Sequence, residues 1–435
     1  MTSTHYNADS GGKASKKENA RRAILAAGIG HVFEWFDFAT YGFLVFTIAR
    51  NFFPANDENA SLLATFGAFG VGFVARPFGA LLLGRIGDIQ GRKWLMTTTM
   101  SIMAISTAGI GLLPTYEKIG IVAPALLILL RLIQGFSLGA EWAAAGTFIV
   151  EWAPPNRRGL YGSFHQVSGT LGLLLGSLGV AALISMLSSE DLANWGWRIP
   201  FLVGALLGPL AVILRRRVTE TPVFERAQLS HSLDKRENIS VTIGLNAAKA
   251  CGLAVAWAVF FYIFLSFMPS FSQKELGFSA SEASWSNTIG ILVNIVAIPV
   301  FGRLSDKFGR RPILMAGCAG FLVLPYPVFA AMINENSLTL LISVQVLFGI
   351  LLGAIAGPGT AALTELFPTS RRSVLLATTY SVSVAIAGGF APFIALWLID
   401  KTGNSIAPTY YVMAAALVGV VASYSMTESA YKPLN

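Results

Sequence analysis

The chain has 435 residues, of which 54% are hydrophobic and only 12% are charged, and 43 more are glycines. Soluble domains are about 45–50% apolar with glycine counted and about 25% charged, so this composition excludes a water-soluble globule, a disordered chain and a disulfide scaffold. It leaves a channel, a membrane enzyme or a transporter. The net charge of +8 is dispersed between apolar runs without a basic–aromatic module, so we expect no nucleic-acid partner.

Twelve apolar runs are long enough to cross about 30 Å of hydrocarbon. They show no alternation with period two, so helices are predicted rather than the strands of a barrel. The fold class predicted is therefore an all-α membrane protein with twelve transmembrane helices. In chain order the predicted spans are 23–49, 62–83, 94–113, 121–152, 160–186, 199–214, 243–271, 284–301, 313–332, 338–367, 373–398 and 408–427.

Basic residues predict the orientation of these spans. The polar, basic first 22 residues lead into a full-length apolar run without a small-residue cleavage site, which predicts a retained first span rather than a signal peptide. With the N-terminus in the cytoplasm, most Lys and Arg residues fall on the cytoplasmic side of the predicted spans. This asymmetry predicts that both termini are cytoplasmic and that the protein is a multi-pass protein of the cytoplasmic (inner) membrane.

The two halves of the chain repeat. The segment 84–93, GRIGDIQGRK, recurs at 302–311 as GRLSDKFGRR, and Glu151-Trp-Ala-Pro-Pro-Asn-Arg157-Arg158 recurs as Glu365-Leu-Phe-Pro-Thr-Ser-Arg371-Arg372. Each copy follows the second or fourth span of its half, which is typical of a parallel duplication of six spans. The predicted units are a tail (1–22), an N-terminal half (23–214), a cytoplasmic central loop (215–242) and a C-terminal half (243–435).

Through these paired loops the sequence resembles the major facilitator superfamily, and its metabolite:proton symporter branch in particular. The branch signatures are Glu34-Trp-Phe-Asp37-Phe, Arg76-Pro77, Arg131-Leu-Ile-Gln134-Gly135-Phe and Trp195-Gly-Trp-Arg198-Ile-Pro200-Phe. The resemblance implies the twelve-helix fold and a substrate such as citrate, 2-oxoglutarate, shikimate, a dicarboxylate, proline or betaine, mostly carried with protons. Some relatives export drugs, so the direction is left open. His31 departs from the branch, which often has Asn or a small polar residue there.

Ionisable residues inside the spans suggest how a proton could be carried. A charge at the centre of a transmembrane helix costs about 2.5–3.5 kcal/mol, so it usually faces a cavity and a partner. His31, Glu34 and Asp37 follow one another at a spacing of three, which predicts one shared helical face. Together with Glu141 they are the predicted proton-coupling residues. The alternative is that Glu34 and Asp37 form a purely structural pair with Arg76, and that the histidines only pack.

Fixed cations and polar residues are the predicted substrate ligands. Arginine suits a carboxylate because its guanidinium binds it through two hydrogen bonds. An ion pair between Arg131 and Glu141 that never touches substrate is an equally weighted alternative. The predicted substrate-binding residues are Arg76, Arg131, Gln134, His165, Gln166, Asn246, Tyr262 and Tyr380.

The duplicated loops predict a gate at the cytoplasmic mouth. An acid there can cap the N-terminus of a neighbouring helix, and the basic residues that follow can pair with acids across the loop. Such contacts would hold the outward-facing state shut on the cytoplasmic side and so bias a two-state equilibrium. The predicted gate residues are Asp88, Arg92, Lys93, Glu151, Arg157, Asp306, Arg310, Arg311, Glu365 and Arg371.

The functional hypothesis is a proton-coupled transporter of a small organic acid or zwitterion. The alternative within transport is a proton-driven exporter of a small anionic drug such as an antibiotic. A membrane enzyme or a sensor is a third possibility, but the sequence contains no Ser-His-Asp order, HExxH motif, Walker loop or cysteine cluster. We expect no enzyme activity, no cofactor and no metal, with protons, the substrate and the lipid bilayer as partners of a monomer.

Overall fold

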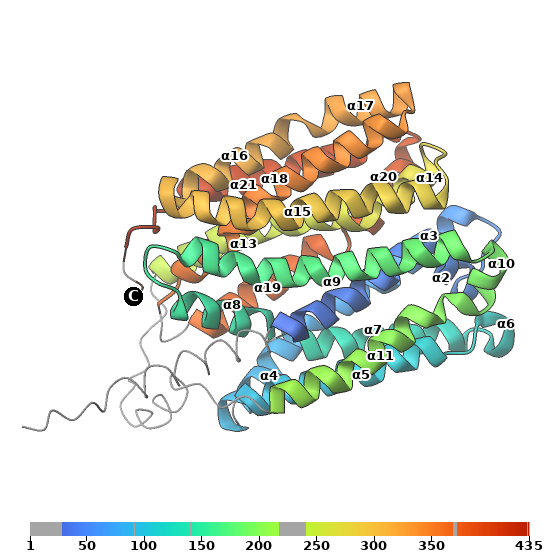
Figure 1. Ribbon diagram of the computed structural model, residues 1–435, viewed down its shortest axis with the longest axis horizontal. Coiled ribbons are helices and arrows are strands. Elements are labelled where there is room, and N and C mark those ends of the chain that lie inside the picture. Colours follow the sequence, from blue (N-terminus) through green and yellow to red (C-terminus); the bar gives the residue numbers. More distant parts are fainter. Residues whose placement is uncertain are drawn as a thin grey trace, which may run out of the picture.

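The computed structural model describes residues 28–90, 92–139, 141–216, 241–368, 372–432 and 434. Within these ranges the secondary structure is helical and contains no strand, as the sequence predicts. Figure 1 shows the helices running side by side between two ends, with the N-terminal half (blue to light green) mostly below the C-terminal half (yellow to red). The predicted tail, 1–22, and nearly all of the predicted central loop lie outside the described residues.

The N-terminal half contains six spans, several of them in two pieces. Asp57 caps the second span by accepting the N–H of Asn59, one of the orphan donors at a helix start. The helices are Gly28–Phe43, α2 (Val45–Phe52), α3 (Glu58–Val74), α4 (Arg76–Gln90), α5 (Arg92–Leu112), α7 (Val122–Leu138), α8 (Glu141–Trp152), α9 (Arg158–Met186) and α11 (Arg198–Arg216), with the short α6 (Tyr116–Ile119), α10 (Ser189–Asp191) and the π-helix η1 (Leu192–Gly196) between them.

The C-terminal half repeats this arrangement. Its second span begins with a capping box, in which Ser279 and Glu282 satisfy each other's backbone N–H groups. The helices are α13 (Val241–Tyr262), α14 (Met268–Lys274), α15 (Ala280–Phe308), α16 (Arg310–Val323), α17 (Pro325–Glu335), α18 (Leu338–Glu365), α19 (Arg372–Ser383), α20 (Ala391–Thr402) and α21 (Pro408–Ser425), and the π-helices η2 (Ile263–Phe267) and η3 (Val384–Gly388) join α13 to α14 and α19 to α20.

Length and hydropathy identify most of the twelve spans. Seven helices, and two further pairs of bent helices, are long and apolar enough to cross a membrane. The helices α5, α11 and α21 complete the twelve at the positions that the sequence predicts. Two spans are bent rather than straight: the first turns by 68° and the ninth by 43°. The first bends because Leu44, with φ −97° and ψ 16°, leaves the helical region, and the ninth bends just before Pro325.

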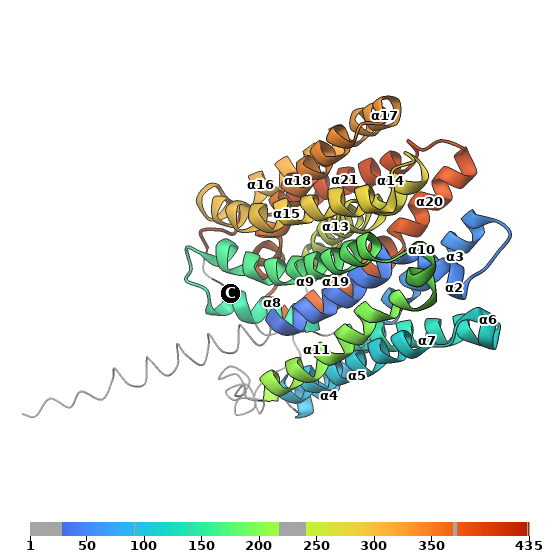
Figure 2. The ribbon, with the colours of Figure 1, turned by 45° about the vertical axis from the view of Figure 1, so that its right-hand side comes forward.

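The two halves meet along α9, α15 and α18, which pack against one another across the middle of the molecule (Figure 2). At the cytoplasmic end of this contact Gly302 of α15 lies so close to α9 that a Cβ atom would stand 2.8 Å from the carbonyl oxygen of Gly159. Only glycine permits this approach, as is common between membrane helices that associate through backbone contact. The close packing places the cytoplasmic ends of the two halves within hydrogen-bonding reach.

Candidate functional site

Glu34 and Arg76 form a buried ion pair at the boundary between the halves. Arg76 Nη2 donates to Glu34 Oε1 at 3.1 Å, and both side chains are at most 3% exposed. The guanidinium lies over the ring of Phe73, with its carbon 4.7 Å from the ring centroid. Phe73 in turn packs edge-on against Tyr262 of α13, at 5.2 Å between centroids. The ion pair therefore belongs to the N-terminal half but is separated from the C-terminal half by a single aromatic layer.

Asp37 lies in a different environment, deep within the N-terminal half. Its Oδ1 accepts from Thr107 at 2.8 Å, and its Oδ2 accepts from Gln134 at 3.0 Å and from Arg131 Nη1 at 3.3 Å. Asp37 and Arg131 are both fully buried. Arg131 also donates to Gln134 at 3.0 Å and lies over the ring of Tyr41 at 4.5 Å. This network ties the first helix to α5 and α7 and gives both oxygens of Asp37 hydrogen-bond donors.

The sequence places Glu34 and Asp37 on one helical face, but the structure gives them separate partners. A spacing of three residues advances an α-helix by about 300°, so the two side chains diverge by about 60°. Arg76 from α4 meets Glu34, whereas Arg131 from α7 meets Asp37. Glu34 therefore borders the C-terminal half, and Asp37 is enclosed in the N-terminal bundle. The alternative ion pair between Arg131 and Glu141 does not form among the residues that the structure describes. Glu141 instead accepts a hydrogen bond from Thr99 at 3.3 Å.

Two histidines and a tryptophan form a second group beside Glu34. The rings of His31 and His165 stack with their centroids 4.3 Å apart. Trp35 Nε1 donates to His31 Nε2 at 2.8 Å. Gln166, next to His165, donates to Thr360 of α18 at 3.1 Å and so reaches the other half. Trp35 lies inside the Glu34–Asp37 motif, but sequence reasoning did not single it out, because an aromatic residue in a membrane helix is ordinarily packing.

Aromatic residues from both halves meet around this group. Trp142 of α8 stacks face to face on Tyr380 of α19, with 3.7 Å between centroids. Trp257 of α13 packs edge-on against both of these rings. The hydroxyl of Tyr262 is buried and has no hydrogen-bond partner among the described residues, and the same holds for Arg76 Nε. Buried polar atoms are usually satisfied, so these two donors are available to a bound polar ligand.

Asn246, a predicted substrate ligand, lies elsewhere. Its side-chain amide donates to the carbonyl oxygen of Leu366 at 2.9 Å. Both residues are at the cytoplasmic ends of their helices, α13 and α18. Asn246 is therefore near the mouth of the protein and remote from the Glu34 group, because it precedes Tyr262 by more than four helical turns.

Four ion pairs connect acids and arginines at the cytoplasmic end, and two of them cross between the halves. Arg372 Nη1 donates to Glu151 Oε1 at 2.7 Å, and Arg158 Nη1 donates to Glu365 Oε1 at 3.0 Å. Arg310 lies 3.4 Å from the same Glu365 oxygen. The two repeated Glu…Arg-Arg motifs thus exchange partners, since each glutamate pairs with an arginine of the opposite half.

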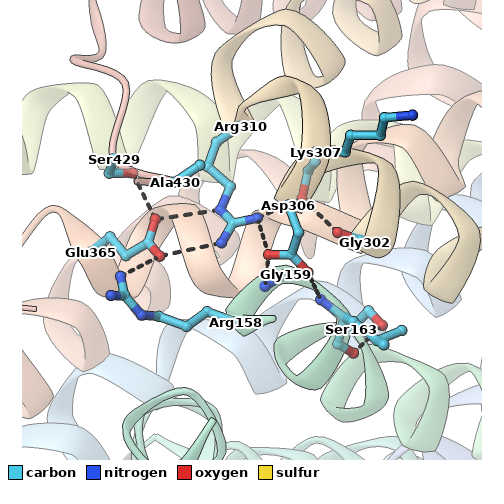
Figure 3. A network of polar contacts seen from close by, with 12 residues as sticks. Arg158, Gly159, Ser163, Gly302, Asp306, Lys307, Arg310, Glu365, Ser429 and Ala430 are labelled. Atoms are coloured by element: carbon cyan, nitrogen blue, oxygen red, sulfur yellow. Dashed lines mark hydrogen bonds and ion pairs between the residues drawn. The ribbon is translucent and has the colours of Figure 1, made fainter. Parts of the chain in front are cut away.

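Asp306 adds a helix cap to these ion pairs. Its carboxylate accepts the N–H groups of Gly159 at 2.8 Å (Figure 3) and Leu160 at 2.9 Å, which lie in the first turn of α9. It also accepts from Arg310 Nη1 at 2.7 Å. A carboxylate at a helix N-terminus is favoured by the orphan N–H groups and the helix dipole. The loop motif of one half therefore holds the start of a helix in the other half.

The segment after α21 joins the same network. Ser429 donates to Glu365 (Figure 3). Arg158 donates to the carbonyl oxygen of Lys432 at 2.8 Å. Burial would raise the pKa of Glu428, but backbone N–H groups, among them those of Ala430 and Arg310, lower it below its ordinary value. Glu428 is therefore ionised at neutral pH and holds the first turn of α16. The sequence gives no sign of this role, because the segment is short and follows the last apolar run.

The predicted gate residues are only partly those that pair. Arg157 is exposed at the N-cap of α9, and its neighbour Arg158 makes the inter-half contact. Arg311 lies with its guanidinium over the ring of Tyr424 at 4.5 Å. Arg371 and the side chains of Asp88, Arg92 and Lys93 lie outside the described residues. Arg158 and Arg372 could have been found from the repeat, since they are the second arginines of the two motifs.

The halves are also joined at the outer end. Asn59 of α3 donates to Asp400 of α20 at 2.9 Å and accepts from Lys274 of α14. Midway along the interface, the hydroxyls of Ser177 and Thr288 are 2.5 Å apart. Polar contacts thus bridge the halves at both ends in this conformation, and the Glu34–Arg76 pair lies between them.

Reversing one charge of the gate should open the cytoplasmic end. In Glu151→Arg the new arginine faces Arg372, so the closed state of the gate is destabilised. A destabilisation of about 1.4 kcal/mol shifts the equilibrium between closed and open states about tenfold. A cysteine at the buried Thr364, with Cys251 and Cys318 changed to Ser, should then react with maleimide about tenfold faster. Adding Arg372→Glu should restore slow labelling, because the pair is re-formed with opposite polarity. Equal labelling in all three proteins would mean that this pair does not hold the gate.

Comparison with known proteins places these features in context. The family Sugar (and other) transporter matches residues 23–249, and the Major Facilitator Superfamily matches residues 250–433. The proline/betaine transporter of Escherichia coli K12 is 36% identical over 427 residues, covering 95% of this chain and 85% of that protein. The glycine betaine/proline/ectoine/pipecolic acid transporter OusA of Dickeya dadantii is also 36% identical, covering 95% and 84%.

Among solved structures, the fold is similar to that of the proton:xylose symporter XylE. One XylE structure aligns with a TM-score of 0.78 over 96% of this chain and 98% of that chain, at 18% identity. A partially occluded, inward-open structure of XylE from E. coli aligns with a TM-score of 0.77, also at 18% identity. At this identity the likeness establishes the arrangement of the helices and nothing about the substrate.

Proposed function

The chain belongs to the major facilitator superfamily of secondary transporters, and from this membership we propose that it carries a small zwitterion or organic acid together with protons. It is a multi-pass protein of the inner membrane and not an enzyme. Transport in this fold proceeds by rocking one half against the other around a site between them. The observation that supports the proposal best is the Glu34–Arg76 ion pair beside the boundary of the halves.

Glu34 is the proposed proton carrier. Water can reach the buried pair only when the contacts at one end separate, so proton access changes with the conformation. A proton on Glu34 cancels its charge and weakens its hold on Arg76, and Arg76 then has a free face for an anionic group. When the pair re-forms, the anionic group and the proton are both displaced. Proton and substrate are coupled because the proton replaces Arg76 as the partner of Glu34, while the anionic group replaces Glu34 as the partner of Arg76.

The aromatic residues suggest how the other end of the substrate is bound. Trp142, Trp257 and Tyr380 bring their rings together from α8, α13 and α19. A cationic group is attracted to aromatic faces, and quaternary ammonium groups are often held in this way. A zwitterion would place its carboxylate at Arg76 and its cationic group against these rings. The relatives named as proline/betaine transporters support this choice over a dicarboxylate.

The proposal is tested by uptake into proteoliposomes with an imposed pH gradient, acidic outside. Labelled glycine betaine and proline should accumulate, and a protonophore should abolish accumulation but not equilibration. Unlabelled succinate should compete poorly if the substrate is zwitterionic. Uptake that ignores the pH gradient would contradict proton coupling. Loss of preloaded compound driven by the opposite movement of protons would instead favour the exporter of a small anion, the alternative that the same residues could serve.

A further inference from the structure

The hydrogen bond between Trp35 and His31 fixes the protonation of the histidine. An indole N–H can only donate, so His31 Nε2, at 2.8 Å from Trp35 Nε1, must present a lone pair. The other ring nitrogen, Nδ1, lies 3.0 Å from the carbonyl oxygen of His165 and 3.0 Å from Ser168 Oγ. The carbonyl can only accept, so Nδ1 carries the proton. His31 is therefore neutral in this conformation, and a proton cannot enter at Nε2 while Trp35 occupies it.

The site is closed tightly around this bond. His31 and Trp35 are 3% and 6% exposed. A Cβ atom on Gly169 of α9 would lie 2.8 Å from His31 Cε1 and 2.8 Å from Trp35 Cδ1, so only glycine leaves room for both rings. In such packing a side chain moves between discrete positions rather than gradually. Release of Trp35 from His31 therefore requires a neighbouring element to move.

The titratable groups that surround His31 come from several elements. His165 of α9 stacks on its ring. Glu34 lies one turn further along the same helix and is paired with Arg76 of α4. Tyr262 of α13 lies beyond Trp35, with 6.2 Å between the ring centroids. A proton gained by His31 thus adds positive charge next to an existing ion pair and a second imidazole.

Trp35 also touches the C-terminal half. Its ring packs edge-on against Phe261 of α13, with 4.7 Å between centroids. Trp35 therefore forms part of the interface between the halves, and its position depends on the lone pair of His31 Nε2.

We propose that His31 and Trp35 form a proton-operated switch, in which a proton on His31 Nε2 displaces the Trp35 N–H and loosens the contact of Trp35 with Phe261. The proton adds to the Nε2 lone pair, no covalent bond other than this N–H forms, and Trp35 keeps its own proton. The buried imidazolium and the unpaired indole N–H both favour a conformation in which water reaches them. Trp35 is a positioning residue, since it acts through the interface. This inference rests on the proposed proton coupling.

The test measures the conformation rather than transport. Spin labels at the exposed Asn156 and Phe308, with Cys251 and Cys318 changed to Ser, report the distance between the halves at the cytoplasmic end. In lipid nanodiscs the parent protein should gain a longer-distance population between about pH 8 and about pH 5.5, the range in which histidine titrates. Trp35→Phe retains a ring against Phe261 but no N–H. It should lose at least half of this pH-dependent population.

His31→Asn should give the same loss, because an amide oxygen accepts from Trp35 at every pH in this range. Trp195→Phe is the matched control. It removes an indole bond of the same spacing, from Trp195 to Asp191 at the outer end, and it should respond to pH as the parent does. An unchanged response in either Trp35→Phe or His31→Asn, or a parent without any response, would overturn the switch.

A second measurement uses only the parent protein, so it does not depend on whether a variant folds. Nitrogen-15 NMR of histidine-labelled parent protein at neutral pH should show one buried imidazole with Nε2 unprotonated and Nδ1 protonated. A buried histidine pair with Nε2 protonated in both rings would overturn the proposal. The proposed function is judged separately, because accumulation driven by the pH gradient could persist when the switch fails. If accumulation itself ignores the gradient, proton coupling is wrong.

Discussion

Glu34→Gln is expected to abolish accumulation driven by a pH gradient while exchange of substrate across the membrane continues. One pH unit corresponds to about 1.4 kcal/mol per proton, so coupling through one proton supports about tenfold accumulation. Glutamine keeps the size and the hydrogen-bonding oxygen that Arg76 contacts at 3.1 Å, but it cannot bind or release a proton in this range. Proteoliposome uptake with and without an imposed gradient measures the accumulation ratio, which should fall to about one.

Glu117→Gln provides the control for this experiment. Glu117 is exposed in the short helix α6 at the outer end, and neutralising it should leave accumulation as in the parent. Counterflow exchange in Glu34→Gln shows whether the variant still folds and binds. A Glu34→Gln protein that accumulates substrate about tenfold in the same gradient would remove Glu34 from the coupling mechanism.

Arg131→Ala is expected to give the largest loss of stability. It leaves Asp37 charged and fully buried without its cationic partner, and breaking a buried pair in this way costs about 3–5 kcal/mol. It also removes a guanidinium that fills the space beside Tyr41 and Phe69. The free energy of unfolding, measured in detergent by denaturant titration, should fall by that amount.

Replacing both partners at once should cost less than the sum of the single changes. In Asp37→Leu with Arg131→Met no charge is left unpaired, and such exchanges of a buried ion pair for apolar residues are often nearly neutral. The coupling energy from this double-mutant cycle reports the pair itself. Arg50→Ala, an exposed change at the end of α2, should leave stability within about 0.5 kcal/mol. A loss in Arg131→Ala as small as this would mean that the pair does not hold the bundle together.

Most of the fold could be predicted from the sequence because the membrane imposes strong rules. Apolar length identified the spans, and the repeated loops identified the two halves. The bend at Leu44 could not be predicted, because no proline lies there and Gly42, two residues earlier, is one of many glycines within the spans. Pro325 does mark the bend of the ninth span, but proline inside a helix need not bend it as far: Pro299 and Pro358 lie within the continuous helices α15 and α18.

The candidate site was predictable in its residue types but not in its pairing. Depth within the spans marked Glu34, Asp37, Arg76 and Arg131 as candidate functional charges. The sequence suggested Arg76 as the partner of both acids and Glu141 as the partner of Arg131, whereas Arg131 pairs with Asp37. Which arginine meets which acid depends on where α4 and α7 cross the first helix. These crossings are set by packing between segments that are far apart in the sequence. The same limit explains why Arg158 rather than Arg157 reaches Glu365. Adjacent residues point about 100° apart on a helix, and only the contact between the halves selects one.

The central claim is that Glu34 exchanges a proton when the halves separate. Infrared difference spectroscopy of the reconstituted protein tests it most directly, because a protonated carboxyl group absorbs apart from a carboxylate. Acidification should produce a carboxylic acid band in the parent and in Asp37→Asn, and Glu34→Gln should lack it. Adding substrate should change the intensity of the same band. A band that is present in Glu34→Gln with unchanged intensity, or that is insensitive to both pH and substrate in the parent, would contradict the account.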